Sequence, residues 1–256
     1  MDQLTNRLGP DREPTPSPDG KYLAYTGYDD KKMATQISHL YLINLKTRKI
    51  QEIKTKLDRS ISNLRWSRDS KNIFFFYDDK GNTKIAKTNL KGKNNILVNN
   101  VGRGYSLAKN GSFVFITTKP DLPSDLAIKI PGKDVKIITS INADILAHKE
   151  LGKVEEIWYK SSFDGLDIQG WIMKPPGFDK SKKYPLIIKI HGGPFSNYGN
   201  RFYLEKQLMV AEGYVVLYVN PRGSTSYGEK FAQLIHHDYP GNDFYDLNSG
   251  VDAAID

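Results

Sequence analysis

The chain has 256 residues, enough for one large domain or two of ordinary size, and 39% of them are hydrophobic, which suffices for a packed core. It contains no cysteine, so disulfides, thiolate metal sites and cysteine nucleophiles are excluded. The formal net charge is +8, but the lysines are spread along turns and strand ends rather than gathered on one helix. We therefore expect a solvated surface and no nucleic-acid partner, with a true anionic partner as the alternative.

Nothing in the sequence indicates membrane association. No run of about 18 apolar residues occurs. Residues 1–8 also lack the apolar stretch of a signal peptide. We therefore expect no membrane partner and a cytoplasmic location.

Three short turn motifs recur in the first half of the chain, each made of Asp or Asn with Gly or Ser and each followed directly by a β-rich run. The turn residues Asp19, Asp69 and Asn110 lie 50 and 41 residues apart. The runs that follow these turns are 21–25, 71–76 and 112–116. A period of about 40 to 50 residues built from short strands is typical of propeller blades.

The interior of the first two repeats also matches. Each has a polar loop (28–31 and 78–82), a second strand-like run and a lysine-containing turn. An unrelated string of hairpins is the alternative. Three blades cannot close a propeller, which needs about four to eight. We therefore assign residues 1–142 to a partial β-propeller of about three blades, which either belongs to a longer propeller or pairs with another subunit.

The pattern changes near residue 143, and we interpret residues 143–154 as a linker that can include a short helix. Beyond it, two strand-like runs flank Asp164-Gly165, a hairpin turn sequence. From Tyr184 onward, buried strands alternate with helices, which predicts a parallel sheet. The expected strands are 155–161, 168–174, 185–190 and 214–219, and the expected helices are 201–212 and 243–256. The first helix is predicted from apolar Phe202, Leu204, Leu208 and Ala211, with Gly213 as its cap.

The segment His191-Gly192-Gly193-Pro194 directly follows the first of the buried strands that alternate with helices. Two glycines let the backbone turn sharply and approach a substrate closely. In hydrolases with such a loop, a backbone N–H donates to the oxyanion of the tetrahedral intermediate. A structural turn without a catalytic role is the alternative.

A second glycine-containing loop, Asn220-Pro221-Arg222-Gly223-Ser224, follows the next buried strand. Blade-like repeats, an Asp-Gly hairpin, His-Gly-Gly-Pro and Asn-Pro-Arg-Gly-Ser in this order resemble the prolyl oligopeptidase family of serine peptidases. The likeness is closest to the acylaminoacyl peptidase and dipeptidyl aminopeptidase branch, weak over 1–142 and specific over 155–256. It implies a mixed β and α/β protein, in which a partial β-propeller precedes the N-terminal part of an α/β-hydrolase domain at 155–256.

The resemblance implies an enzyme that hydrolyses peptide bonds through an acyl-enzyme, with a Ser-Asp-His triad, a peptide substrate and no cofactor. The nucleophile of this fold lies in a Gly-x-Ser-x-Gly elbow. Ser224 and Ser226 have no glycine two positions before them, and Ser249 stands between Asn248 and Gly250. We therefore expect none of the triad in this sequence, and an inactive fragment that lacks a C-terminal half.

Gly193 is the candidate donor of one oxyanion N–H, and the resemblance implies that the residue after the missing serine supplies the other. The loop residues expected to support it are His191, Gly192, Pro194, Arg222 and Gly223. His191 is interpreted as structural, because the triad base should lie far downstream. Arg222 is expected to brace the loop, with substrate binding as the alternative.

His236-His237-Asp238 is the remaining group of titratable residues that suggests a metal site or a base. Adjacent residues on a helix point in different directions, so we interpret the group as a solvated loop or helix end and expect no metal. Two other functions remain open. The chain is a non-catalytic binding module, or it is one half of a split enzyme completed by a separately encoded C-terminal half.

Overall fold

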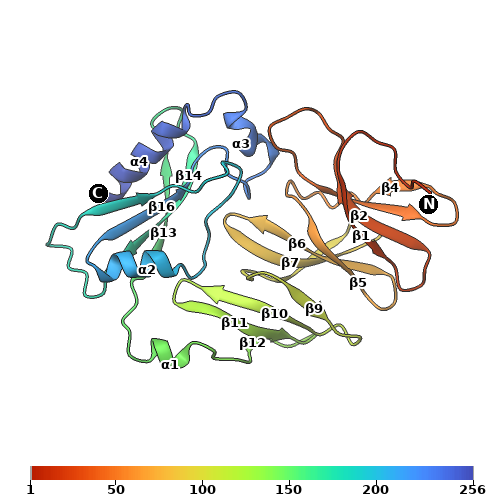
Figure 1. Ribbon diagram of the computed structural model, residues 1–256, viewed down its shortest axis with the longest axis horizontal. Coiled ribbons are helices and arrows are strands. Elements are labelled where there is room, and N and C mark those ends of the chain that lie inside the picture. The colour runs from red at the N-terminus through yellow and green to blue at the C-terminus, as the bar shows by residue number, and fades with distance from the viewer. Residues whose placement is uncertain (1, 256) are drawn as a thin grey trace. The chain divides into compact units, whose positions relative to one another are not determined.

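The structure, a computed structural model, describes residues 2–255, and the chain divides into two compact units. The first unit contains the chain up to Thr117 together with Leu126–Ile138 and Ser226–Glu229. The second contains Thr118–Asp125, Thr139–Thr225 and the chain from Lys230 onward. Strands dominate the N-terminal half, whereas the C-terminal half combines one sheet with helices (Figure 1).

Three four-stranded sheets follow one another along the N-terminal half, each with its strands in sequence order. The first contains β1 (Asp11–Pro16), β2 (Tyr22–Gly27), β3 (His39–Asn44) and β4 (Ile50–Glu52). The second contains β5 (Ser62–Trp66), β6 (Asn72–Asp79), β7 (Asn82–Asn89) and β8 (Asn94–Val98). The third contains β9 (Tyr105–Leu107), β10 (Phe113–Lys119), β11 (Leu122–Lys129) and β12 (Lys136–Ile137). This half is therefore built from β-sheets, as the sequence predicted.

The recurring turns have the same geometry where they connect the first two strands of a sheet. The Asp19 carboxylate accepts the Ser17 hydroxyl at 2.6 Å, and Asp69 accepts the Ser67 hydroxyl at 2.6 Å. The residue after each anchor has a positive φ: Gly20 (69°), Ser70 (57°) and Gly111 (81°). Six positions before each anchor the backbone is again left-handed: Glu13 (55°), Asn63 (58°) and Gly104 (81°). The three sheets therefore repeat in backbone conformation as well as in strand order.

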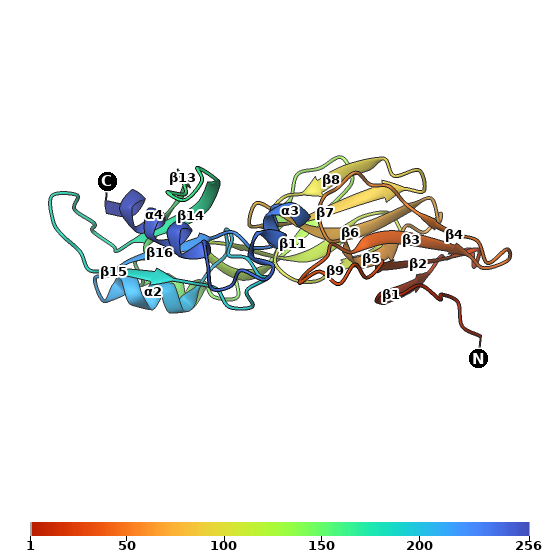
Figure 2. The same cartoon turned by 90° about the horizontal axis from the view of Figure 1, so that it is seen from above.

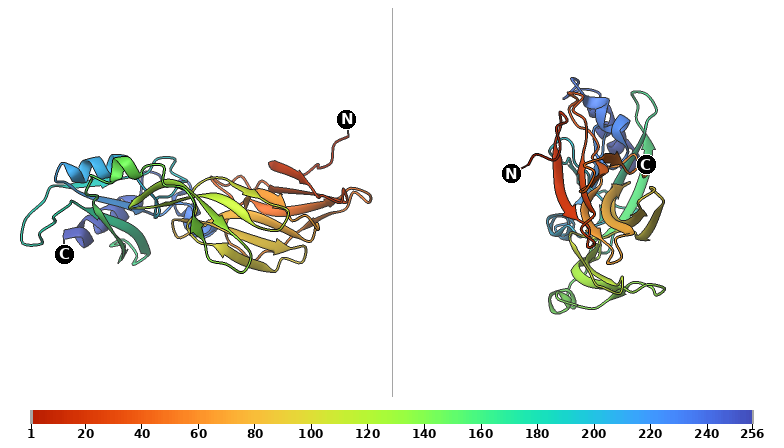
Figure 3. Two further views of the ribbon diagram at one scale, coloured as in Figure 1. Left: turned by 90° about the horizontal axis from the view of Figure 1, so that it is seen from below. Right: turned by 90° about the vertical axis from the view of Figure 1, so that its right-hand side faces the viewer.

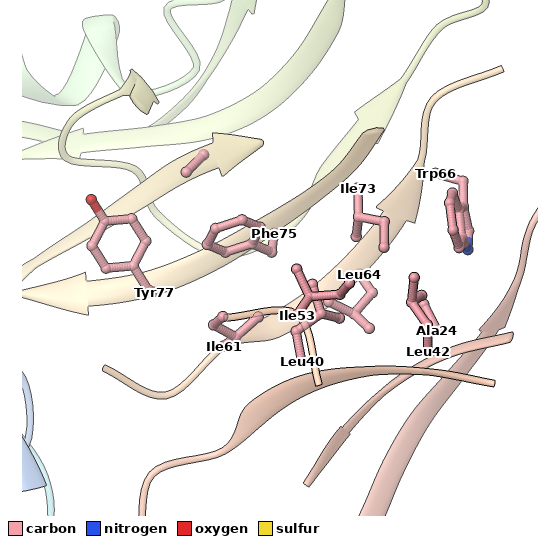
Figure 4. Packing of buried hydrophobic residues seen from close by; sticks show 11 residues of the cluster. Ala24, Leu40, Leu42, Ile53, Ile61, Leu64, Trp66, Ile73, Phe75 and Tyr77 are labelled. Atoms are coloured by element: carbon pink, nitrogen blue, oxygen red, sulfur yellow. The ribbon is translucent and has the colours of Figure 1, made fainter. Parts of the chain in front are cut away.

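Strand β6 is buried on both faces because it lies in the middle of this array. Its residues Ile73 and Phe75 pack with the first sheet, in a cluster that includes Leu40 (Figure 4). Phe74 and Phe76 point the other way and pack with aromatic residues of the third sheet. The continuous apolar run of β6 thus reflects burial on two sides.

The second unit contains a four-stranded mixed sheet in the order β13-β14-β16-β15. Its strands are β13 (Lys153–Lys160), β14 (Asp167–Lys174), β15 (Leu186–Lys189) and β16 (Val215–Asn220). β15 and β16 are parallel, as the strand–helix–strand pattern predicted, whereas β13 and β14 form the expected antiparallel hairpin. β13 begins at Lys153, two residues before the predicted start at residue 155 and inside the segment interpreted as a linker.

Two helices, α2 (Leu204–Ala211) and α4 (Asp243–Ile255), cover opposite faces of this sheet (Figures 2 and 3). Val210 of α2 packs on one face with Trp171 and Tyr218. Val251 of α4 packs on the other face with Leu217. The remaining helices are short: α1 (Ala143–Leu146), α3 (Glu229–Ala232) and the 3-10 helix η1 (Gln233–Ile235).

The apolar residues that predicted α2 are not the ones that it buries. Leu204 and Leu208 are 62% and 61% exposed, whereas Lys206, Gln207 and Val210 are buried. The helical spacing of the leucines was therefore a correct signal for a helix and a misleading one for its orientation. The cap was predicted correctly, since the residue after the C-cap Glu212 is Gly213 with φ of 87°.

Candidate functional site

The two glycine-containing loops lie at the same end of the second unit's sheet. Residues 190–203 follow β15 and residues 221–225 follow β16, and parallel strands end at the same edge of a sheet. The Thr225 N–H donates to the Ser196 carbonyl over 2.9 Å. His191 Nε2 lies 2.9 Å from Ser224 Oγ. The two motifs, which are separate in sequence, thus form one connected structure.

The His191–Ser224 contact has the distance of a catalytic dyad but not its chemistry. Ser224 is 1% exposed, and its hydroxyl donates to the Pro221 carbonyl over 2.6 Å. A hydroxyl has one proton, so Ser224 Oγ accepts from His191 Nε2–H. Burial lowers the pKa of His191, which keeps the ring neutral. Its Nδ1 has no hydrogen-bond partner within residues 2–255, so no carboxylate orients it as a base.

Gly193 has the backbone conformation and the free donor that an oxyanion site needs. Its φ is 133°, a region that L side chains rarely adopt, and an added Cβ would lie 3.1 Å from the Phe195 nitrogen. The residue is exposed, and its N–H finds no acceptor in the part of the chain that the structure describes. Gly192 has open space around it, so Gly193 is the more constrained of the two glycines.

Asn220 holds the far end of the loop after β15, a role that the sequence did not reveal. It is fully buried, its Oδ1 accepts the Tyr198 N–H over 2.7 Å, and its Nδ2 donates to the Tyr198 carbonyl over 3.0 Å. The side chain thus replaces the backbone hydrogen bonds that an irregular loop lacks. An amide at the end of a buried apolar strand was the signal for this role, since a buried polar group needs partners.

Arg222 braces the loop after β16 from inside the unit. Its guanidinium, with 3% of the side chain exposed, donates to Asp246 (Nη2–Oδ1, 2.8 Å) and to the half-exposed Asp164 (Nη2–Oδ1, 3.0 Å). The Arg222 N–H also donates to Asp246 Oδ2 over 2.8 Å. Burial alone would lower the pKa of Arg222, but the hydrogen bonds to the two carboxylates outweigh it and raise the pKa. This arrangement leaves little of the guanidinium free for a substrate.

Lys206 of α2 lies buried among tyrosines beneath the loop after β15. Its Nζ lies 3.5 Å from the ring centroid of Tyr203, 4.3 Å from that of Tyr198 and 4.8 Å from that of Tyr218. Tyr198 in turn contacts the His191 ring edge-on at 5.4 Å. Burial lowers the pKa of Lys206 to about 8, while the ring faces favour the cation. The cage links α2 to the loop that carries Gly193.

The His236-His237-Asp238 group belongs to neither of the two glycine-containing loops. The two histidine rings lie 3.9 Å apart between centroids, just after η1, and His237 and Asp238 are exposed. Within residues 2–255, no group of three His, Cys, Asp or Glu side chains is arranged to hold a metal ion. Over the same residues, no helix is both long and apolar enough to span a membrane.

Sequence comparison identifies relatives of the whole chain. Peptidase S9, the prolyl oligopeptidase family, matches residues 200–256. The Bacillus subtilis (strain 168) protein called Uncharacterized peptidase YuxL is 35% identical over 197 residues, covering 74% of this chain and 29% of that protein. Dipeptidyl-peptidase 5 of Porphyromonas gingivalis is 29% identical over 257 residues, covering 96% of this chain and 36% of that protein. The chain thus spans about a third of the length of these curated relatives.

Solved structures agree with the sequence relatives. Pyrococcus horikoshii acylaminoacyl peptidase has a TM-score of 0.84 and 22% identity, over 99% of this chain and 39% of that chain. Porphyromonas gingivalis dipeptidyl peptidase 4 has a TM-score of 0.70 and 19% identity, over 91% of this chain and 34% of that chain. The fold of the chain is therefore the one that these two solved structures share with it. The chain belongs to the prolyl oligopeptidase family of serine peptidases.

Proposed function

We propose that this chain is part of a serine peptidase that hydrolyses short peptides through an acyl-enzyme, with Gly193 as one oxyanion donor. The observation that supports this role is the exposed, unpaired N–H of Gly193 on a loop braced by buried groups. The sequence contains no Gly-x-Ser-x-Gly elbow, so the nucleophile and its partners must come from outside residues 1–256. On its own the chain is expected to be inactive.

The proposal includes an architecture. Residues 1–142 are part of a β-propeller, residues 143–154 are a linker, and residues 155–256 are the N-terminal part of an α/β-hydrolase domain. Three consecutive four-stranded sheets with matching turns support the propeller. The parallel β15 and β16, with α2 and α4 on opposite faces of their sheet, support the hydrolase domain. The similarity in fold to Pyrococcus horikoshii acylaminoacyl peptidase extends over 99% of this chain and so includes both parts.

The chemistry assigned to the chain is electrostatic. When a serine attacks the peptide carbonyl, negative charge develops on the carbonyl oxygen. A fixed N–H stabilises that charge more than it stabilises the neutral carbonyl, so it lowers the barrier to the reaction. The braces at His191, Asn220 and Arg222 hold the loop before the substrate arrives, so little reorganisation is needed during the reaction. A peptide is the proposed substrate, and one solved neighbour is acylaminoacyl peptidase in complex with Z-Gly-Gly-Phe-chloromethyl ketone.

The test replaces the Gly193 N–H alone, in the peptidase that contains this chain. Because φ at Gly193 is 133°, Gly193→Ala strains the turn and cannot isolate the hydrogen bond. Incorporating glycolic acid at position 193 turns the amide into an ester, which removes the N–H and adds no side chain. We expect kcat to fall by about 10² to 10³ with the melting temperature nearly unchanged.

The matched control is the same ester substitution at Gly192, whose surroundings are open. It should leave kcat within about threefold of the unmodified enzyme, because the proposed oxyanion donor is the N–H of Gly193 and not that of Gly192. Loss of the Gly193 donor alone accounts for the fall of about 10² to 10³. Equal losses at 192 and 193, or a loss at 193 that is fully explained by a lower melting temperature, would show that Gly193 is a structural turn residue.

A further inference from the structure

A cleft of about 770 Å³ opens in the first unit between the second and third sheets. It is lined by the turns that precede β6 and β10, and by residues of β7, β8 and β11. Leu97 and Leu107, both half-buried, form its apolar part above the buried rings of Phe74 and Phe113. The volume is within the range of about 300 to 1,000 Å³ that small-ligand and short-peptide sites occupy. None of the candidate active-site residues lines it.

The lining carries an excess of positive charge. Four cationic side chains line the cleft: Arg68, Lys87, Lys109 and Lys129. None of the four forms an ion pair in the part of the chain that the structure describes, and Lys129 donates to the backbone carbonyl of Lys133. Lys87 comes from the second sheet and Lys129 from the third, so cations lie on both sides of the cleft.

The one acidic residue of the lining, Asp69, offsets only one of the four positive charges. The Asp69 carboxylate accepts the Ser67 hydroxyl over 2.6 Å and the Lys71 N–H over 3.1 Å. These bonds, the hydroxyl first, lower the pKa of Asp69 and commit it to its own turn. The lining also includes Asn72 and Asn95, whose amides can bond to a peptide backbone.

We propose that this cleft binds a short acidic peptide, with carboxylates on the cations and an apolar side chain on Leu97 and Leu107. A free phosphate ion fits the cations but leaves the apolar part uncovered. Nucleic acid fits less well, because the rings of Phe74 and Phe113 are only 6% and 3% exposed and cannot stack on bases. A peptide satisfies the charge, the amides and the apolar surface together. The proposal does not depend on the proposed peptidase activity.

The test measures fluorescence anisotropy of fluorescein-Gly-Glu-Leu-Glu-amide with this chain at about 0.15 M salt, where the Debye length is about 8 Å. The comparison peptide has Gln in place of both Glu residues. We expect saturable binding of the acidic peptide and at least about tenfold weaker binding of the Gln peptide, which is about 1.4 kcal/mol. Inorganic phosphate is expected to compete only weakly. Equal binding of both peptides, tighter binding of phosphate or of a single-stranded oligonucleotide, or no saturation by about 1 mM would overturn the proposal.

Charge variants locate the binding. The double variant Lys87→Gln/Lys129→Gln should weaken the acidic peptide at least about tenfold, or 1.4 kcal/mol. Its matched control is Lys46→Gln/Lys49→Gln, which removes two exposed lysines from the first sheet and should change affinity less than about twofold. Equal losses of affinity in the two double variants would mean non-specific electrostatic attraction and would contradict the proposal.

A further variant keeps the test decisive if the double variant does not fold. Lys109 is exposed on the turn before β10, so Lys109→Gln should preserve the melting temperature. It should still weaken the acidic peptide about threefold or more, because one cation of four is lost. A thermal melt checks that Lys109→Gln is folded. Unchanged affinity of the folded variant would show that the acidic peptide does not bind in this cleft.

Discussion

At the scale of single residues, three buried polar side chains of the second unit have partners of matching chemistry. Arg222 meets Asp246, Asn220 meets the Tyr198 backbone, and Lys206 meets tyrosine rings. A buried polar group without a partner costs about 1 to 3 kcal/mol, and a buried unpaired charge costs more. Removal of one partner from such a pair would therefore leave the other buried and unpaired, and would lower the stability of the unit.

Removing the Arg222 charge should destabilise the second unit strongly. Arg222→Met leaves the fully buried Asp246 carboxylate without its cation, which typically costs about 3 to 5 kcal/mol. Urea unfolding measures the change. The added substitution Asp246→Asn should recover part of the loss, because it removes the stranded charge.

The matched control for Arg222→Met is Lys160→Met, which breaks the exposed Lys160–Asp167 pair of the same unit. This change should cost less than about 1 kcal/mol, because exposed pairs are well solvated. If Arg222→Met cost no more than Lys160→Met, the bracing role of Arg222 would be wrong.

Lys206 should make stability depend on pH in the alkaline range. Its pKa in the folded chain is lowered to about 8, so between pH 8 and 10.5 the unfolded chain holds a proton that the folded chain has lost. Stability from this group therefore rises with pH across that window, by at most roughly 3 kcal/mol. Burial raises the pKa of Tyr198 to about 12 and also raises the pKa values of Tyr203 and Tyr218, so the cage stays neutral there.

The comparison of wild type with Lys206→Met isolates this term. The difference in unfolding free energy, measured by urea titration at pH 7, 8.5 and 10, should shift in favour of the wild type as pH rises. Tyrosine ionisation and the other lysines are common to both proteins. A difference that stays constant over this range would show that the Lys206 pKa is not lowered in the folded chain.

At the scale of elements, the repeats account for part of the left-handed backbone in the first unit. The turns between the third and fourth strands of the three sheets contain Arg48 (φ 59°), Gly92 (83°) and Gly132 (75°). Two of the three positions are glycine, which adopts this conformation without a steric penalty, whereas a side chain costs about 1 to 2 kcal/mol. The arginine is therefore the least favourable residue of the three.

Replacing Arg48 with glycine should stabilise the first unit by about 0.5 to 1 kcal/mol, once the entropy cost of glycine is subtracted. The exposed Arg48–Asp2 contact, at 3.7 Å, contributes little. Lys46→Gly, in the same turn but at a position without positive φ, is the control and should destabilise by a similar amount. Thermal melts report both, and destabilisation by both changes to the same extent would contradict the repeat argument.

At the scale of the whole molecule, large apolar side chains remain exposed on the helices of the second unit. Leu204 and Leu208 on α2 and Phe244 on α4 are each about 60% exposed. Leu204 and Leu208 lie one turn apart on α2, and exposed apolar surface of this kind favours association. Residues 1–256 expressed alone should therefore bind a hydrophobic dye and self-associate.

A variant with Leu204→Lys and Leu208→Lys should bind less dye and sediment as a smaller species, without a lower melting temperature. Both side chains already face solvent, so their replacement removes little packing. Val210→Lys is the contrast, because that side chain is buried and its loss should unfold the unit. A wild-type chain that is monomeric and does not bind dye would refute the association.

Sequence alone determined the local features of this protein. Turn chemistry at Asp19, Asp69 and Asn110 located three repeats, since Asp and Asn bond to the backbone two residues on. Apolar runs located β15 and β16, because a strand covered on both faces is apolar throughout. The motifs also identified the family, because short catalytic loops need particular residues at fixed spacing.

Only the tertiary structure decided which residues meet. The burial of Lys206 instead of Leu204, the Asn220 clamp and the Asp246 partner of Arg222 depend on segments that are up to 24 residues apart. Hydrophobic spacing cannot show which face of a helix docks, because a ring cage can accept a cation as well as a leucine. The basic cleft likewise forms where two sheets pack. The sequence does not show that its four cations lie together, because Lys87 and Lys129 come from different sheets and line opposite sides of the cleft.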